Sequence, residues 1–306
     1  MQQGGIAEDM LEYLDLYFKV KTGEFAKTER DLISVTFKKV IAKERKAIQL
    51  LEHLVEQPKL KRYESNMRFY LERQKEELKA KLVRIVQMLQ NNCLPHADNA
   101  ESRTFFLNLV GDFYRYQIEL IRVEEYSALE NLAPIQKKAR RDRDALIQRA
   151  NEAYSEAFKM GVAYLNPCNA TRLSVALNYT IFLADFRRDR QKALTLSAIV
   201  QELALTRIDD SAQPGTEENQ LTSCTITQEE QELIESIQYN IDLWTEELDN
   251  LAQKSHQTSN RAPSGNQQNV NGGNINVIPQ DRDTALPPPS RDSISLNQAN
   301  IPVSQV

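Results

Sequence analysis

Two basic residues, Lys38 and Arg45, stand seven positions apart in one stretch of the chain. In an α-helix of 3.6 residues per turn, this spacing puts both side chains on the same face, about two turns apart. Two cations on one face can bind an anionic group together, although such pairs more often belong to an ordinary solvated face. The pair by itself therefore leaves both interpretations open.

Residue types that support other chemistry are scattered. The three cysteines, Cys93, Cys168 and Cys224, are far apart, and so are the three histidines, so their spacing gives neither a zinc pattern nor a disulfide framework. The sequence contains no P-loop, no glycine-rich dinucleotide turn and no clear pairing of a nucleophile with a base. We therefore expect no metal, no cofactor and no enzymatic activity.

Composition limits the class of protein and its partners. The chain has 306 residues, 41% of them hydrophobic, and 38 basic against 43 acidic residues give a net charge of −5. A mildly acidic chain argues against general nucleic-acid binding. No apolar run could span a membrane, and the N-terminus lacks a signal-peptide core. We expect a soluble protein of the cytoplasm, with the nucleus as a further location and with neither nucleic acid nor membrane as a partner.

Helical periodicity dominates the first 250 residues. In the stretch 29–57, apolar residues recur every three or four positions, and Pro58 follows that stretch. No segment shows the alternating pattern of a strand, and Thr227 with Glu230 forms a capping-box pattern at the start of the last helix. The pattern predicts an all-α fold of stacked helical hairpins. The other expected helices are 63–90, 99–130, 144–160, 171–187, 191–208 and 227–251.

Three segments interrupt this pattern. An insert at 124–145 contains a basic run at 137–143, KKARRDR, before an expected helix; it is predicted to be a solvated helix end or loop, with a localisation signal or anion-binding patch as the alternative. Residues 209–226 are rich in Asp, Ser, Thr and Gln, which is typical of a surface loop. From Ser255 the chain is rich in Asn, Gln, Ser and Pro and cannot bury enough apolar surface to fold. We therefore predict a helical domain at 1–253 and a disordered tail at 254–306.

Five segments, in order, resemble conserved blocks of the 14-3-3 family. The resemblance covers about residues 7–250, apart from the two interrupting segments within that range. It implies an all-α antiparallel helical array that forms a concave amphipathic groove. The segments are ERDLISVTFK at 29–38, NLVGDFYRY at 108–116, AYSEAF at 153–158, RLSVALNY at 172–179 and NIDLWT at 240–245.

The resemblance implies a phosphate site made by Lys38, Arg45, Arg115 and Tyr116. A phosphoserine carries a charge of about −1.5 to −2 and three acceptor oxygens. Arginine can bind it with a two-pronged fork, lysine adds a compact charge, and tyrosine adds a neutral donor. We expect the three cations to lie on polar helix faces, where substitution costs the fold little.

Two acidic residues are expected to support this site. Asp112 and Glu119 lie three or four positions from Arg115 or Tyr116 on the same helix. Asp112 is predicted to hold a basic side chain in its binding rotamer. For Glu119, an ordinary surface position is the alternative.

The resemblance also implies a peptide-binding surface next to the phosphate. Asn178 and Asn240 match family asparagines that bond the extended peptide backbone, for which an amide offers both a donor and an acceptor. For the apolar positions, plain core packing is the alternative. The matching groove residues are Leu177, Ile181, Asp185, Leu243 and Trp244.

Some residues depart from the family pattern. Glu44 replaces the first of two arginines, Gln49 a further arginine, Asn108 a groove lysine and Ser236 a groove leucine. The groove rim is therefore expected to be less basic and less apolar. Only residues 6–10 match the end of the family's first helix, so we expect a weakened homodimer, a monomer, or a heterodimer with a complete family member.

The resemblance implies an adaptor that binds phosphoserine or phosphothreonine motifs of partner proteins in signalling. Its partners would be phosphorylated proteins, whose activity or location it would regulate. The alternative is a helical scaffold that binds unphosphorylated partners through the same groove.

Overall fold

The computed structural model describes residues 3–121, 134–212 and 226–259, and these ranges contain helices and connecting turns but no strand. The predicted all-α class is confirmed. No helix within these ranges is long and apolar enough to cross a membrane. The elements are α1 (Gln3–Val20), α2 (Lys27–Val55), η1 (Pro58–Tyr63), α3 (Glu64–Met88), η2 (Leu89–Cys93), η3 (Leu94–His96), α4 (Ala100–Glu119), α5 (Pro134–Tyr164), α6 (Ala170–Asp185), α7 (Arg190–Ala212) and α8 (Gln228–Ser259).

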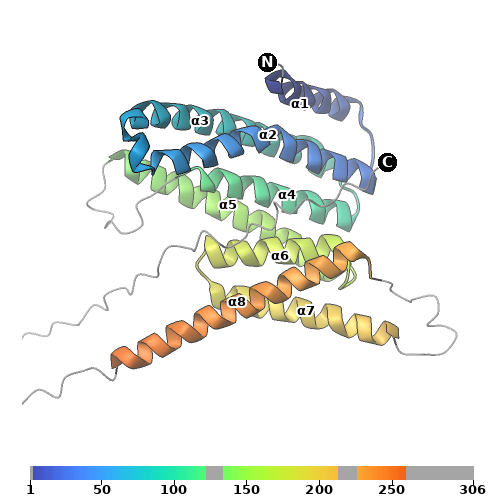
Figure 1. Ribbon diagram of the computed structural model, residues 1–306. Coiled ribbons are helices and arrows are strands. Elements are labelled where there is room, and N and C mark those ends of the chain that lie inside the picture. The colour runs from blue at the N-terminus through green and yellow to red at the C-terminus, as the bar shows by residue number, and fades with distance from the viewer. Residues whose placement is uncertain (1–2, 122–133, 213–225, 260–306) are drawn as a thin grey trace, which may run out of the picture.

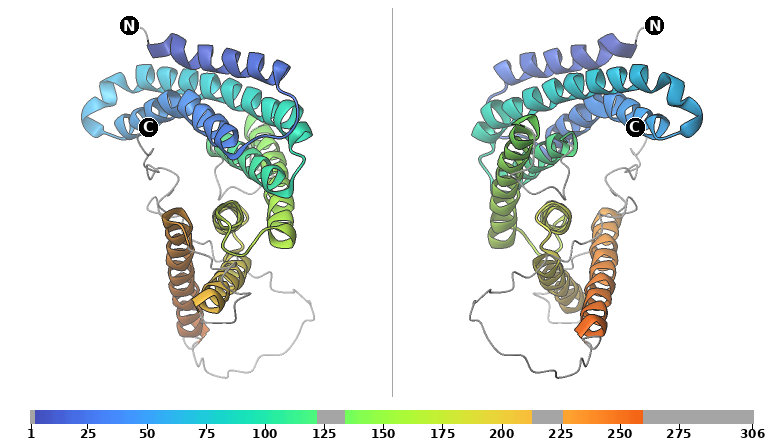
Figure 2. Two further views of the ribbon diagram at one scale, coloured as in Figure 1. Left: turned by 90° about the vertical axis from the view of Figure 1, so that its right-hand side faces the viewer. Right: turned by 90° about the vertical axis from the view of Figure 1, so that its left-hand side faces the viewer.

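The helices follow one another around an arc (Figure 1). Neighbours in sequence pack together, as α2 does with α3, α4 with α5 and α7 with α8. The helix α6 contacts both α4 and α8 and so links the two halves of the chain. In the two side views, the arc is open between α2 and α8 (Figure 2). The predicted antiparallel array with a concave side is confirmed.

Several boundaries differ from the expected ranges. The helix α5 begins at Pro134, so the basic run 137–143 lies inside its first turns and not before them. The helix α8 continues to Ser259, so residues 254–259 are helical where disorder was expected. The remainder of the predicted tail, at 260–306, lies outside the described residues, as do 122–130 of the expected third helix and 213–225 of the expected loop. The capping box of α8 is present: the Glu230 amide donates to Thr227 Oγ1 and the Thr227 amide donates to the Glu230 carboxylate.

The helix α1 was not predicted from periodicity. Leu11, Leu14 and Phe18 face the core, at the spacing of one helix face. Tyr13 and Leu16, however, are 71% and 57% exposed. Apolar residues therefore occur on the outer face of this helix as well as on its buried face, and they obscure its amphipathic periodicity. The N-terminal segment is therefore helical well beyond the 6–10 match.

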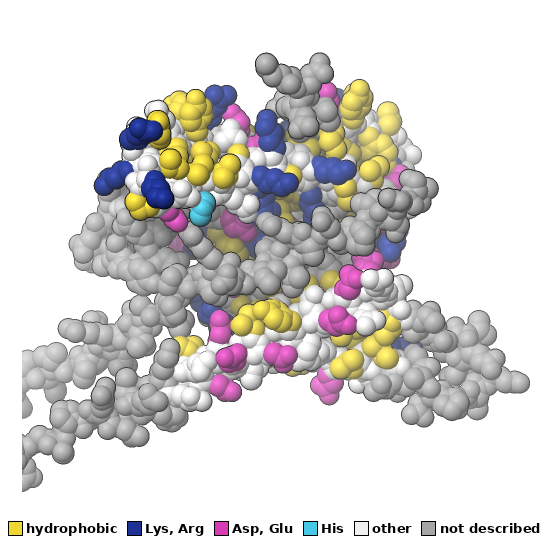
Figure 3. All heavy atoms as spheres, in the orientation of Figure 1, with side chains coloured by type: hydrophobic (Ala, Val, Ile, Leu, Met, Phe, Trp, Pro, Cys, Tyr) yellow, Lys and Arg dark blue, Asp and Glu magenta, His cyan; other side chains and the backbone are white. Residues whose placement is uncertain are grey.

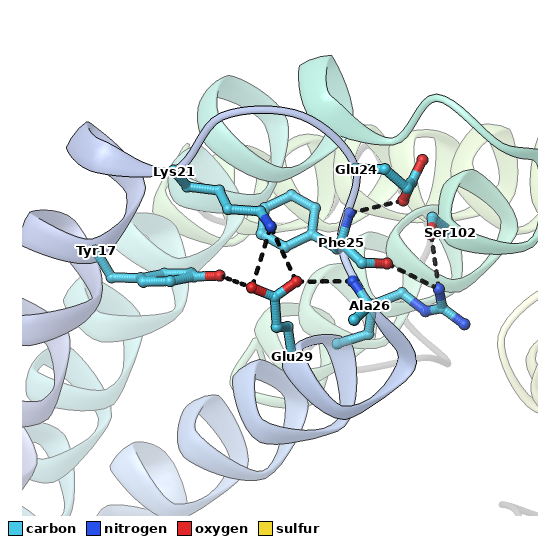
Figure 4. Close-up of polar contacts among 8 residues, drawn as sticks. Tyr17, Lys21, Glu24, Phe25, Ala26, Glu29 and Ser102 are labelled. Atoms are coloured by element: carbon cyan, nitrogen blue, oxygen red, sulfur yellow. Dashed lines mark hydrogen bonds and ion pairs between the residues drawn. The ribbon is translucent and has the colours of Figure 1, made fainter.

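A polar cluster fixes the corner between α1 and α2 (Figure 4). Glu29 accepts hydrogen bonds from the Tyr17 hydroxyl at 2.5 Å, from Lys21 at 2.9 Å and from the Ala26 amide at 2.7 Å. The bonds from Tyr17 and Lys21 hold the pKa of Glu29 at about 2. The carboxylate therefore stays ionised and anchors the start of α2.

The same corner is tied to the start of α4. The buried Arg30 of α2 donates to the Phe25 carbonyl at 3.2 Å and to Ser102 Oγ at 2.8 Å. Glu24 accepts the Asn99 amide at 2.8 Å, and the Asn99 side chain caps α4 by accepting the Ser102 amide. These bonds fix α2 and α4, which carry all four expected phosphate ligands, against each other at one end.

Candidate functional site

Arg115 is buried in α4, with 6% of its surface exposed. Its Nη1 lies 3.1 Å from Glu119 Oε1, and its Nη2 lies 3.5 Å from Asp112 Oδ1. Burial alone would lower the pKa of Arg115, but neighbouring phenol and carboxylate oxygens outweigh burial and raise that pKa well above its usual value. The expectation that Arg115 lies on a polar face is wrong, because its helix is buried on nearly every side at this point.

Tyr154 of α5 completes the surroundings of Arg115. Its hydroxyl donates to Asp112 Oδ1 at 2.7 Å and accepts from Arg115 Nε at 3.4 Å. Its ring presses against Gly111, where an added Cβ would come within 2.6 Å of two ring carbons. Only glycine allows α4 and α5 to approach this closely. Asp112 therefore contacts a basic side chain, as its predicted role requires, and Tyr154 shares that contact.

Arg45 of α2 reaches the same place from the opposite side. Its Nη2 lies 3.5 Å from Glu119 Oε2, so the two oxygens of Glu119 bridge Arg45 and Arg115. Both arginines also contact the ring of Tyr116, with guanidinium carbons 4.1 Å and 4.9 Å from its centroid. Contacts among the described residues thus join three of the four expected phosphate ligands, and Glu119 is part of that cluster.

Lys38 lies two turns before Arg45 on α2 and is half-buried. Seven residues of helix rise about 10.5 Å, so its long side chain starts about that far along the helix from Arg45. At the level of Lys38, α2 and α4 are in contact, since the rings of Phe37 on α2 and Phe113 on α4 meet edge to face with centroids 5.9 Å apart. Lys38 is therefore placed beside the cluster, without a direct contact in it among the described residues.

Asp185 extends the site to the end of α6. Burial raises the pKa of its carboxyl, and the guanidinium groups of Arg190 and Arg115 oppose that shift. Arg190 itself pairs with Glu247 of α8 at 2.6 Å. The charges of α4, α6, α7 and α8 therefore act on one another where these helices meet.

The two asparagines expected to bind peptide are both buried, each with 7% exposure. Asn178 Nδ2 donates to the Asn108 side-chain oxygen at 3.3 Å, so the residue that replaces a family lysine contacts this asparagine. Asn240 Nδ2 has no hydrogen-bond partner among the described residues. A buried donor without a hydrogen-bond partner lowers the stability of the fold by about 1–3 kcal/mol. Such a donor next to a proposed binding surface is therefore a candidate to bind a ligand.

The expected apolar lining is largely shared with the core. Leu177 and Trp244 are 8% and 4% exposed and belong to core clusters. Ile181 and Leu243 are partly buried and pack against those clusters. Each of the four keeps at most a partly exposed face, so core packing accounts for most of their surface.

The charges outside the site are unevenly distributed. Figure 3 shows Lys and Arg side chains gathered over α2 and α3, whereas Asp and Glu side chains lie over α8. The sequence has no Lys or Arg between 228 and 253, and glutamines bond the acids of α8 instead, as Gln231 does with Glu235. Glu44, the replacement for a family arginine, pairs with Lys81 of α3 at 2.8 Å.

Sequence reasoning missed Tyr154 as a site residue. Its segment, 153–158, was matched as a whole, but no spacing rule connects a residue of α5 to Arg115, which lies 39 positions earlier. The signal that could have found it is the glycine before Asp112. A helical glycine in an aromatic-rich segment often marks a close approach by another element.

Fold and site together define an all-α protein whose concave array carries a buried arginine-centred cluster. The chain matches the family model for the 14-3-3 protein over residues 1–245. It is 24% identical over 264 residues to a 14-3-3-like protein of Solanum tuberosum, which covers 85% of this chain and 92% of the relative. It is 24% identical over 251 residues to 14-3-3 protein zeta of Bombyx mori, covering 80% and 90%. For 14-3-3 protein beta/alpha of Bos taurus the identity is 22% over 253 residues, covering 81% and 92%.

The chain therefore belongs to the 14-3-3 family, as a divergent member. The family consists of adaptor proteins that bind partner proteins and form dimers.

Proposed function

We propose that this chain is an adaptor that binds phosphoserine and phosphothreonine segments of partner proteins and so regulates their activity or location. The observation that carries the proposal is the meeting of Arg45 and Arg115, from two different helices, on the single carboxylate of Glu119. Two guanidinium groups so close together need a shared anion. A phosphate, with its higher charge and three oxygens, can accept from both.

Donors remain available for such a ligand. A guanidinium has five N–H groups. Arg115 directs Nε at Tyr154, one Nη2 hydrogen at Asp112 and one Nη1 hydrogen at Glu119. Two N–H groups are then left for a phosphate, and Lys38 can add a third cation from α2. Three cations against two carboxylates leave a net charge of about +1, which favours an anionic group.

The asparagines support a peptide as the carrier of that phosphate. An extended peptide offers one carbonyl and one amide per residue, and the unpartnered Nδ2 of Asn240 can donate to such a carbonyl. Asn178, with Asn108 beside it, can do the same on α6. We propose that Asp185, Leu177, Ile181, Leu243 and Trp244 contact the residues that flank the phosphate.

This function involves neither catalysis nor a cofactor, and its partners are phosphorylated proteins in the cytoplasm, with the nucleus as a further location.

We also propose weak self-association, through exposed residues of α1 and α3 such as Tyr13 and Tyr70, which are 71% and 55% exposed. Sedimentation velocity should then show a monomer–dimer equilibrium that shifts over loading concentrations of about 1 to 50 µM, because small transient interfaces associate weakly. A stable dimer at the lowest concentration would contradict it.

A phosphopeptide library tests the main proposal. The full chain is titrated against labelled degenerate peptides with a central phosphoserine and against the same peptides without phosphate. We expect binding only to the phosphorylated set, weakened by salt because charges dominate the contact. Equal binding to both sets would favour the alternative, a scaffold that uses the same groove for unphosphorylated partners. A pull-down before and after phosphatase treatment separates the two functions in the same way.

A further inference from the structure

The Arg115 guanidinium is held mainly by its own helix. Asp112, Tyr116 and Glu119, which contact it, all belong to α4 and move with it. Among the described residues, Tyr154 is the hydrogen-bond partner that comes from another helix. Asp112 and Glu119 restrict the rotamer of Arg115 from its own helix, and Glu119 also pairs with Arg45 of α2. The Tyr154 hydroxyl, in contrast, bonds the guanidinium directly from another helix, α5.

We propose that the hydroxyl of Tyr154 is the positioning group of the phosphate site and sets the direction in which Arg115 presents its free donors. The proposal rests on the proposed function, since it concerns the same site. It assigns Tyr154 an effect through Arg115, not a contact with the ligand.

The direction of the hydrogen bonds fixes this arrangement. A tyrosine hydroxyl has one hydrogen, and the shorter contact, 2.7 Å to Asp112 Oδ1, takes it. The oxygen then faces Arg115 Nε with a lone pair, at 3.4 Å. Asp112 Oδ1 also receives Arg115 Nη2 at 3.5 Å, which closes a triangle of three groups. The Nε edge of the guanidinium is therefore turned toward α5, and the remaining N–H groups are turned away from it.

The ring of Tyr154 is itself fully buried and closely packed. The side chain has no exposed surface and packs between Gly111, Phe182 at a centroid distance of 5.3 Å and Tyr179 at 6.2 Å. A ring confined in this way keeps its hydroxyl in one place, because tightly packed interiors allow little displacement. Through this hydroxyl, the position of the Arg115 guanidinium is fixed relative to α5 and α6.

Removal of the hydroxyl should loosen Arg115 without removing its charge. In Tyr154→Phe the ring stays, but Arg115 Nε loses its acceptor and the guanidinium can turn about its last bonds. We expect phosphopeptide affinity to fall about tenfold, the size of effect found when groups that orient a ligand are removed elsewhere. Tyr179→Phe is the matched control, since it removes a hydroxyl from a buried tyrosine of the same cluster, with 5% exposure. It should leave affinity within about twofold of wild type.

A double-mutant cycle separates positioning from general loosening of the core. In an Arg115→Lys background, lysine has no Nε–H to hold, so adding Tyr154→Phe should change affinity less than twofold, roughly the limit for uncoupled sites. In an Arg45→Lys background the full, about tenfold, loss should persist. A loss of the same size in all three backgrounds would overturn the proposal, as would wild-type affinity in Tyr154→Phe.

A measurement without peptide keeps this inference apart from the proposed function. The Nε–H of Arg115 should exchange slowly with solvent in the wild type and about tenfold faster in Tyr154→Phe, because a buried hydrogen bond protects it. A wild type that shows no preference for phosphorylated peptide would refute the proposed function alone. Unchanged exchange in Tyr154→Phe would refute the positioning role even if phosphopeptide binds.

Discussion

Reversing the charge of Lys38 should abolish phosphopeptide binding and leave the fold intact. Lys38 is half-buried beside the arginine cluster on α2, and among the described residues no hydrogen bond or ion pair ties it to the core. Lys38→Glu changes the net charge of the pocket from about +1 to about −1, so a phosphate of charge −1.5 to −2 meets a like charge. Breaking a close charge contact of this kind costs about 2–5 kcal/mol, which corresponds to roughly 30-fold to several thousandfold in affinity.

The next residue provides the control. Lys39 is exposed on another face of α2, because successive helical positions differ by about 100°. Lys39→Glu makes the same change in total charge, so both variants feel the same long-range repulsion, which salt at 0.15 M largely screens. Fluorescence anisotropy at that salt, with melting curves for each variant, makes the comparison. Equal affinities of the two variants, with both folded, would refute the placement of the phosphate.

Three further changes test the surroundings of the site. Gly111→Ala forces a Cβ to within 2.6 Å of the buried Tyr154 ring and should cost about 1–3 kcal/mol in thermal unfolding, whereas Gly161→Ala, with neighbours at 3.6 Å or more, should not destabilise. Arg115→Glu should lower stability by about 3–5 kcal/mol in denaturant titrations, because it leaves two carboxylates beside a third; a wild-type midpoint would contradict its burial. The pKa of Glu29, depressed to about 2 in the folded state, gives stability above pH 4.5 that is lost as the pH falls toward 2. Glu29→Gln should therefore cost about 1 kcal/mol at pH 7, a figure reduced for partial exposure, and less at pH 3, as urea unfolding can check.

The fold was largely predictable because amphipathic periods survive in most helices. The range 29–57 was predicted and α2 spans Lys27–Val55, since its apolar stripe is uninterrupted. The prediction failed for α1, where apolar residues such as Tyr13 and Leu16 also face outward. It also failed at the start of α5, because a run of basic residues looks like a solvated segment whether or not it is helical.

The site was predictable in its members and not in its architecture. Spacing placed Lys38 and Arg45 on one face, and the resemblance to the family supplied Arg115 and Tyr116. Neither could show that Glu119 bridges two arginines from different helices, since that contact joins residues 74 positions apart. Long-range contacts depend on how helices pack, and sequence periodicity does not indicate which helices pack together.

Arg115 shows why the binding and folding roles of this site cannot be separated. A guanidinium exposed to 6% is stable only if its charge is balanced locally; Asp112 and Glu119 balance it, and the neutral Tyr154 hydroxyl accepts its Nε–H. The same three groups restrict its rotamer, so the residual donors point in one direction before any ligand arrives. A ligand then meets a group whose ordering cost was met during folding, which favours affinity. Substitutions at Arg115 must therefore be judged by stability and affinity together, whereas Lys38 reports on affinity alone.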